Sequence, residues 1–166
     1  MRRSQALLAL AVVLLFVTGC EQALAIELAG QGLDEQTIEA ITREVLAANR
    51  AMTEAGNNRD LDALFGFVLD GADPIVQDGV LFATKQEARQ VVEKGFQGVS
   101  RVERSFDHTT VMVLSTAAAI LTANGETRVV LDDGRALSSP FAVTLLFVLQ
   151  GQEWRVRHGH YSVPNR

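Results

Sequence analysis

The stretch PFAVTLLFVLQGQEWRVRHGHYSVP, residues 140–164, predicts an antiparallel β-hairpin. Apolar residues recur at every second position on either side of Gly151-Gln152, which is typical of two strands that share one buried face. A two-residue loop at Gly151-Gln152 pairs Gln150 with Glu153 and fixes the register of all pairs beyond them. This register puts ten residues on the more apolar face: Phe141, Val143, Leu145, Phe147, Leu149, Trp154, Val156, His158, His160 and Ser162.

The two histidines of this hairpin, His158 and His160, are expected to point inward because they share the apolar face. A one-residue slip in both strands would reverse the faces, and the apolar character of this face argues against a slip. The opposite face is also rich in apolar residues: Ala142, Leu146, Val148 and Tyr161. Since an exposed sheet face rarely carries so much apolar surface, we expect a homodimer that covers it.

Three helices are predicted upstream of this sheet. Apolar residues at steps of three and four place one helical face on residues 34–56, with Asp34 as the N-cap. A second, shorter helix begins at Asp60. The third begins at Thr84, which forms a capping box with Glu87.

The remaining segments are predicted as strands. Residues 73–82 form a short hairpin that turns at Asp78-Gly79, a favoured two-residue turn. Residues 116–131 form the strand that precedes the C-terminal hairpin. The strand before it carries seven residues on one face: Val102, Arg104, Phe106, His108, Thr110, Met112 and Leu114. Helices followed by a long antiparallel meander indicate the α+β class.

The N-terminal sequence MRRSQALLALAVVLLFVTGC predicts export. Two arginines precede an apolar run, Ala6–Val17, that is shorter than the ~20 residues a membrane-spanning helix needs and suits a signal peptide. The VTGC that follows resembles a bacterial lipobox, which implies cleavage before Cys20 and a lipid on its sulfur. Cleavage after Ala25 is the alternative. We therefore divide the chain into a signal peptide (1–19), a lipid attachment site and tether (20–33) and one domain (34–164).

Charge and cysteine content narrow the choice of partners. The formal net charge is −5 at pH 7, and both charges of the signal peptide are arginines, so the exported chain is still more acidic. An acidic protein is a poor partner for nucleic acid and for anionic lipid surfaces. Cys20 is the single cysteine, so no disulfide forms, and the expected localisation is the bacterial cell envelope, lipid-anchored on the periplasmic or extracytoplasmic side.

The order of elements, the Asp78-Gly79 hairpin and the closing WRVRHGHYSVP, with Trp154, His160 and Ser162, resemble the SnoaL-like branch of the nuclear-transport-factor-like superfamily. The resemblance covers about residues 34–164. It implies a ketosteroid-isomerase-like cone: a curved antiparallel sheet of about six strands wrapped around the three helices, with an internal pocket. Members include isomerases, cyclases, dehydratases and binding proteins, so the resemblance fixes no activity.

Six residues are candidates for lining such a pocket: His160, His158, Arg104, His108, Ser162 and Trp154. A metal site is not expected, because the family's sheet order separates His108 from the other two histidines by three strand spacings, about 14 Å. Each inward histidine has a second interpretation as a core residue with a hydrogen-bonded ring. Arg104 could bind a ligand carboxylate or extend to water. Asp78 could act as a general base, but the Asp-Gly turn explains it without chemistry.

Two functions remain open from the sequence. The first is a lipid-anchored protein, without cofactor, whose pocket binds a small apolar or weakly acidic molecule. The second is an isomerase, cyclase or dehydratase in which His160 is the acid or base and Arg104 or His108 stabilises charge. The first is preferred, because no carboxylate is placed inside the cone to complete an acid–base pair.

Overall fold

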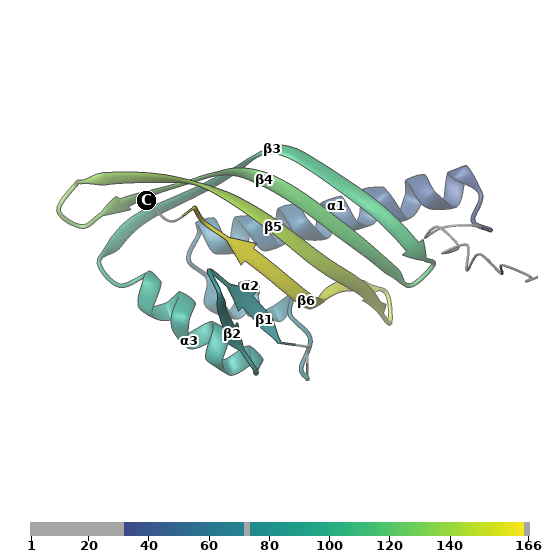
Figure 1. The fold of residues 1–166 in the computed structure, drawn as a ribbon, viewed down its shortest axis with the longest axis horizontal. Coiled ribbons are helices and arrows are strands. Elements are labelled where there is room, and N and C mark those ends of the chain that lie inside the picture. Colours follow the sequence, from purple (N-terminus) through teal and green to yellow (C-terminus); the bar gives the residue numbers. More distant parts are fainter. Residues whose placement is uncertain (1–31, 72–73, 165–166) are drawn as a thin grey trace, which may run out of the picture.

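The computed structural model describes residues 32–71 and 74–164. Three helices, α1 (Glu35–Asn57), α2 (Leu61–Gly66) and α3 (Lys85–Gly95), precede the long strands. Figure 1 shows the long helix α1 running beside the sheet, with α2 and α3 gathered near one end of it. No helix of the described residues is long and apolar enough to cross a membrane.

The helix starts follow the capping residues predicted from the sequence. The Asp34 carboxylate accepts a hydrogen bond from the Thr37 backbone N–H at 2.8 Å, and this satisfies one of the unpaired donors of the first turn. Asp60 caps α2 in the same way, through the N–H of Ala63. At α3 the Thr84 hydroxyl accepts from the Glu87 N–H at 3.1 Å, so the predicted N-cap is confirmed.

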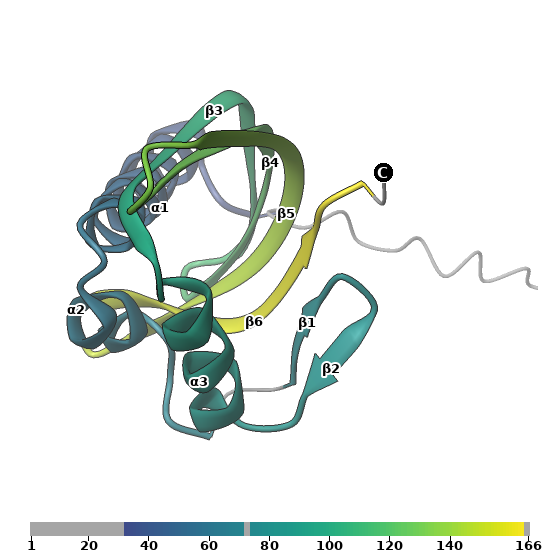
Figure 2. The same ribbon diagram turned by 90° about the vertical axis from the view of Figure 1, so that its left-hand side faces the viewer.

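Six strands form a single sheet: β1 (Ile75–Gln77), β2 (Val80–Phe82), β3 (Val99–Ser115), β4 (Ala118–Leu131), β5 (Ala136–Gln150) and β6 (Glu153–Ser162). Their order is β2-β1-β6-β5-β4-β3. The α+β class and the curved sheet are confirmed, but the sheet is mixed, because β1 pairs with β6 in parallel. The other four strand pairs are antiparallel, and the parallel pair arises because β1 joins the edge of β6 from a separate hairpin rather than through the meander. Figure 2 shows the sheet curling around the interior.

Of the four register shifts along the long strands, two decide which side chains face the interior around the cavity. The register of β3 against β4 shifts between Phe106 and His108, so one residue of β3 is inserted there. The register of β5 against β6 shifts between the pairs Phe147–Val156 and Leu146–His158, which inserts one residue in β6. A β-bulge exchanges the two faces of a strand beyond it, because side chains alternate with a period of two.

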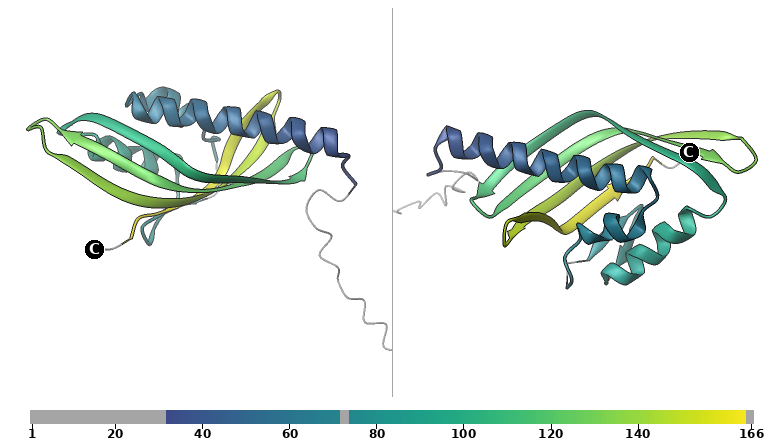
Figure 3. Two further views of the ribbon diagram at one scale, coloured as in Figure 1. Left: turned by 90° about the horizontal axis from the view of Figure 1, so that it is seen from above. Right: turned by 180° about the vertical axis from the view of Figure 1, so that it is seen from behind.

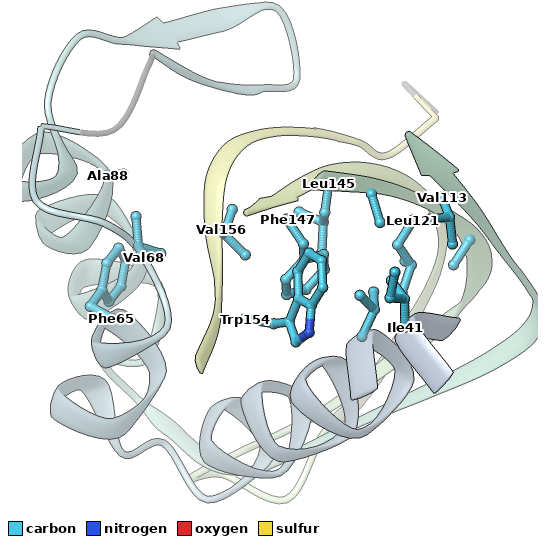
Figure 4. Close-up of a cluster of buried hydrophobic side chains, with 13 residues drawn as sticks. Ile41, Phe65, Val68, Ala88, Val113, Leu121, Leu145, Phe147, Trp154 and Val156 are labelled. Atoms are coloured by element: carbon cyan, nitrogen blue, oxygen red, sulfur yellow. The ribbon is translucent and has the colours of Figure 1, made fainter. Parts of the chain in front are cut away.

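The apolar core lies between α1 and one end of the sheet. The two bulges separate this end from the rest of the sheet. Figure 4 shows Ile41 of α1 facing Leu121, Phe147 and Trp154 of the strands. Phe147 and Leu121 are completely buried, and burial of a large apolar side chain contributes about 1.5–3 kcal/mol each. The first four predicted pairs of the C-terminal hairpin, from Gln150–Glu153 to Phe147–Val156, are confirmed. The view from behind in Figure 3 shows α1 crossing the strands over this core.

Candidate functional site

A cavity of about 660 Å³ lies at the other end of the molecule, between the C-terminal half of α1, the helix α3 and the long strands. Its volume is within the range of about 300–1,000 Å³ that is typical of small-molecule sites. The wall is mostly apolar, with these residues among its members: Met52, Leu64, Ile75, Val92, Val102, Phe106, Val129, Phe141 and Val143. The site therefore favours a ligand with a substantial apolar body.

Arg104 brings a positive charge into this wall. Its guanidinium carbon lies 5.3 Å from the ring centre of Phe141 and 5.0 Å from that of Tyr161, which are distances typical of cation–π contacts. The backbone N–H of Arg104 donates to the Asn57 side-chain oxygen at 2.9 Å, so α1 holds this segment of β3 in place. None of the ion pairs between described residues involves Arg104.

The surroundings of Arg104 are aromatic and hydroxylic. Phe141 stacks on Tyr161 and meets the edge of Phe106, both at centroid distances of 5.4 Å. The Thr127 hydroxyl lies 3.4 Å from Nε of Arg104 and 3.4 Å from the Tyr161 hydroxyl. The packed rings limit the movement of the guanidinium, and the hydroxyl groups add hydrogen-bonding capacity beside it.

The charge of the site has one sign. Of the described residues that border the cavity, none is an aspartate or a glutamate, whereas Arg104 supplies a permanent cation. A half-buried arginine in an apolar wall interacts more strongly with an anion than an arginine in bulk water does, because the local dielectric constant is lower. The cavity can therefore hold a molecule with an acidic group, such as a carboxylate, at Arg104.

Both histidines of the C-terminal hairpin lie differently from the prediction. His158 pairs with Leu146 and His160 with Thr144, on the convex face of the sheet, while Gly159 and Tyr161 take the inward positions. The cause is the bulge at Arg157, which shifts all later residues by one position. His160 still borders the cavity, but its side chain is exposed and alternates with Tyr161, so its backbone forms that part of the wall.

The other predicted pocket residues are spread over three environments. Arg104 lies in the cavity wall, with its guanidinium beside Phe141 and Tyr161. His108, paired with Asn124, and Ser162, paired with Ala142, lie on the convex face because they follow the two bulges. Trp154 belongs to the core, where its indole N–H donates to the Glu44 carboxylate at 2.8 Å.

Asp78 has the structural role of a turn residue. Asp78 and Gly79 have φ values of 51° and 81°, as a tight hairpin turn with two left-handed residues requires. The Asp78 carboxylate also accepts the backbone N–H of Val163 at 2.7 Å, and this bond fixes the end of the chain beside Tyr161. Among the described residues, no cluster of three or more potential metal ligands is found.

Among the polar residues of the wall that the sequence pattern did not indicate are Tyr161, Thr127, Asn57 and Asn49. The two-residue alternation places Tyr161 on the outer face, because the sequence pattern does not show where a bulge reverses the faces of the strand. Gly159 was a hint, since a glycine inside a strand often marks a bulge or a close approach. Asn49 was detectable as well, because it follows the fully buried Val45 by four residues on the inner face of α1.

Comparisons with known proteins agree with this architecture. A family model described as a SnoaL-like domain matches residues 45–166. A candidate dehydratase of the NTF2-like family from Streptomyces avermitilis has a TM-score of 0.69 at 16% identity, covering 77% of this chain and 99% of that chain. A comparison with curated proteins gives no match.

Two further solved structures are similar at the level of the fold. A candidate scytalone dehydratase from Novosphingobium aromaticivorans has a TM-score of 0.72 at 7% identity, covering 78% of this chain and 88% of that one. An NTF2-like superfamily protein from Salmonella enterica has a TM-score of 0.66 at 13% identity, covering 78% and 94%. Identities this low establish a common fold and leave the activity to be argued from the site.

Proposed function

We propose that this chain, which belongs to the SnoaL-like domain family, is a binding protein whose cavity takes a small, largely apolar molecule with an acidic group. The observation that carries the proposal is Arg104 on its aromatic support, in a wall whose described residues include no carboxylate. The apolar body of the ligand fills the cavity, and its anionic group pairs with the guanidinium, which can bind a carboxylate through two parallel hydrogen bonds.

Binding is preferred over turnover because of the groups that face the cavity. An isomerase or a dehydratase needs a base within hydrogen-bonding reach of the substrate. The ring of His160, which the sequence offered for that role, lies on the convex face. Tyr161 brings a hydroxyl group to the cavity wall, which can orient a ligand by a hydrogen bond. Two structural neighbours are described as candidate dehydratases, but their low sequence identity does not transfer that activity to this chain.

Titration calorimetry with decanoate and its uncharged analogue methyl decanoate tests the proposal. We expect decanoate to bind the purified full-length protein about tenfold or more tightly than the ester, because only the acid pairs with Arg104. Arg104→Met should remove this preference. Arg128→Met is the matched control, since it removes the same charge from an exposed position of β4. Equal binding of the two compounds, or no binding of decanoate, would refute the proposal.

The cellular setting is proposed from the sequence. We propose that the signal peptide is removed before Cys20, that the new N-terminus carries lipid, and that the domain is held at the extracytoplasmic side of a bacterial membrane. Residues 1–31 lie outside the described part of the chain. A membrane-anchored binding protein at that place meets apolar acids that cross or leave the envelope, which agrees with the chemistry of the cavity.

We propose a homodimer through the convex face of the sheet, with a different set of apolar residues from the one expected from the sequence. Tyr161 is absent from that face, because it points into the cavity. The apolar residues that remain there belong to neighbouring strands, with Met112 55% exposed and Ile120, Leu146 and Val148 half-buried. Met112, Ile120 and Leu146 are paired across β3, β4 and β5 and form one continuous row that a second copy can cover.

A further inference from the structure

Asn49 is the buried polar residue of the described core. It lies on α1, is 3% exposed, and is one of the residues that border the cavity. Its neighbours one helical turn away are Val45, which is completely buried, and Thr53, which also borders the cavity. Asn49 is therefore at the boundary between the core and the cavity. Several residues border the cavity and are also members of the core: Phe65, Val68, Ala88, Leu145 and Val156. The core and the cavity are therefore continuous, and we call the side of the cavity next to the core its inner end.

The side-chain oxygen of Asn49 is buried and has no hydrogen-bond partner among the described residues. Asn57, two turns further along α1, is different, because its side-chain oxygen accepts the backbone N–H of Arg104 at 2.9 Å. A buried polar atom without a partner lowers stability, and such atoms are rare in folded proteins. An apolar residue would serve the core better at this position, so a partner for Asn49 is expected from outside the described residues, and the cavity beside it is where a ligand can supply one.

We infer that Asn49 is a second recognition point of the cavity, which binds a hydroxyl group on the ligand. This inference rests on the proposed function and makes it more specific: the ligand is an apolar acid with a hydroxyl group remote from the acidic end. The acid pairs with Arg104, and the hydroxyl donates a hydrogen bond to Asn49 at the inner end of the cavity. A hydroxyl suits this place, because it both donates and accepts and so pairs with either end of a carboxamide.

The experiment compares decanoate with 10-hydroxydecanoate, whose flexible chain lets the hydroxyl reach the inner end of the cavity. Both acids are titrated into the full-length wild type and into Asn49→Leu, whose side chain has the same branching and number of heavy atoms but no polar group. In the wild type the hydroxy acid should bind at least as tightly as decanoate. In Asn49→Leu the hydroxyl has no partner, so the ratio of the two dissociation constants should change by about five- to 100-fold against the hydroxy acid.

Asn124→Leu is the matched control, because it makes the same substitution at an exposed position of β4 that does not border the cavity. It should leave the ratio unchanged. An equal ratio in wild type and Asn49→Leu would overturn the inference while leaving the decanoate result, and with it the proposed function, intact. If decanoate itself fails to bind the wild type, both fall together.

Thermal unfolding without ligand gives an independent readout. If Asn49 is kept for a ligand, Asn49→Leu should raise the Tm of the ligand-free protein by about 3 °C or more, because it removes an unsatisfied buried group. Asn49→Ala provides a second variant if leucine does not fit. A fall in Tm for both variants would show that the carboxamide supports the fold, and would overturn the inference.

Discussion

Gly125→Ala tests the bulge that orients β3, and through it the position of Arg104. Gly125 is buried on β4 opposite Phe106, directly beside the register shift. A methyl group there would lie 2.0 Å from the backbone oxygen of Ser105 and 2.9 Å from the Cα of Phe106. Both atoms belong to the backbone of β3, so relief requires the two strands to separate rather than one side chain to rotate. We expect a loss of about 3 kcal/mol in the free energy of unfolding, at the upper end of typical overpacking.

Gly159→Ala is the matched control on the same concave face. Its methyl group would lie 3.1 Å from Cδ2 of Leu145, the end of a flexible side chain. We expect a change below about 1 kcal/mol, partly offset by the lower entropy that alanine gives the unfolded chain. Urea unfolding with equal m-values measures both variants. If Gly125→Ala costs less than about 1 kcal/mol, the close approach of β3 and β4 is wrong, and the inward position of Arg104 loses its support.

Three further predictions concern the anchor, the assembly and the response to acid. Cys20→Ser should leave the protein unprocessed or free of membranes, and fractionation identical to the wild type would contradict lipidation. Light scattering at micromolar concentration should show a dimer that Leu146→Glu converts to monomers; a monomeric wild type would rule the dimer out. The hydrogen bonds from the backbone and side chain of Thr37 lower the pKa of Asp34 below 3.8, so this N-cap stabilises the fold above that pH and its contribution is lost as the pH falls through the folded pKa. Asp34→Ala should therefore be less stable than the wild type at pH 6, and the gap should narrow as the pH falls below 3.8; a gap that does not vary with pH would count against the cap.

The parts of the fold that depend on local chemistry could be predicted from the sequence. A capping residue such as Asp34 or Thr84 acts within one helical turn, and the Asp78-Gly79 turn needs only its own left-handed backbone angles. The C-terminal hairpin followed its predicted register as far as Phe147–Val156. Beyond Val156 the prediction failed, because a bulge depends on how neighbouring strands curve together and carries no periodic pattern of its own.

The same limit explains which site residues were placed correctly. Arg104 comes before the bulge of β3 and kept its inward position, whereas His108 comes after it and was displaced to the convex face. His160 and Tyr161 exchanged roles for the same reason in β6. The alternation of inward and outward side chains could therefore be predicted from each end of a strand. The residue at which a bulge reverses this alternation could not be predicted.

The two bulges lie where each strand passes from the core to the cavity. In β3 the cavity segment, with Arg104, comes before the bulge, and Val113 of the core comes after it. In β6 the order is reversed, because Val156 of the core precedes the bulge and Tyr161 follows it. A bulge increases the local twist and bends its strand, so the sheet can pack against α1 at one end and curve away from it at the other. The irregularities that made the histidines unpredictable are thus the features that open the cavity and turn Tyr161 toward Arg104.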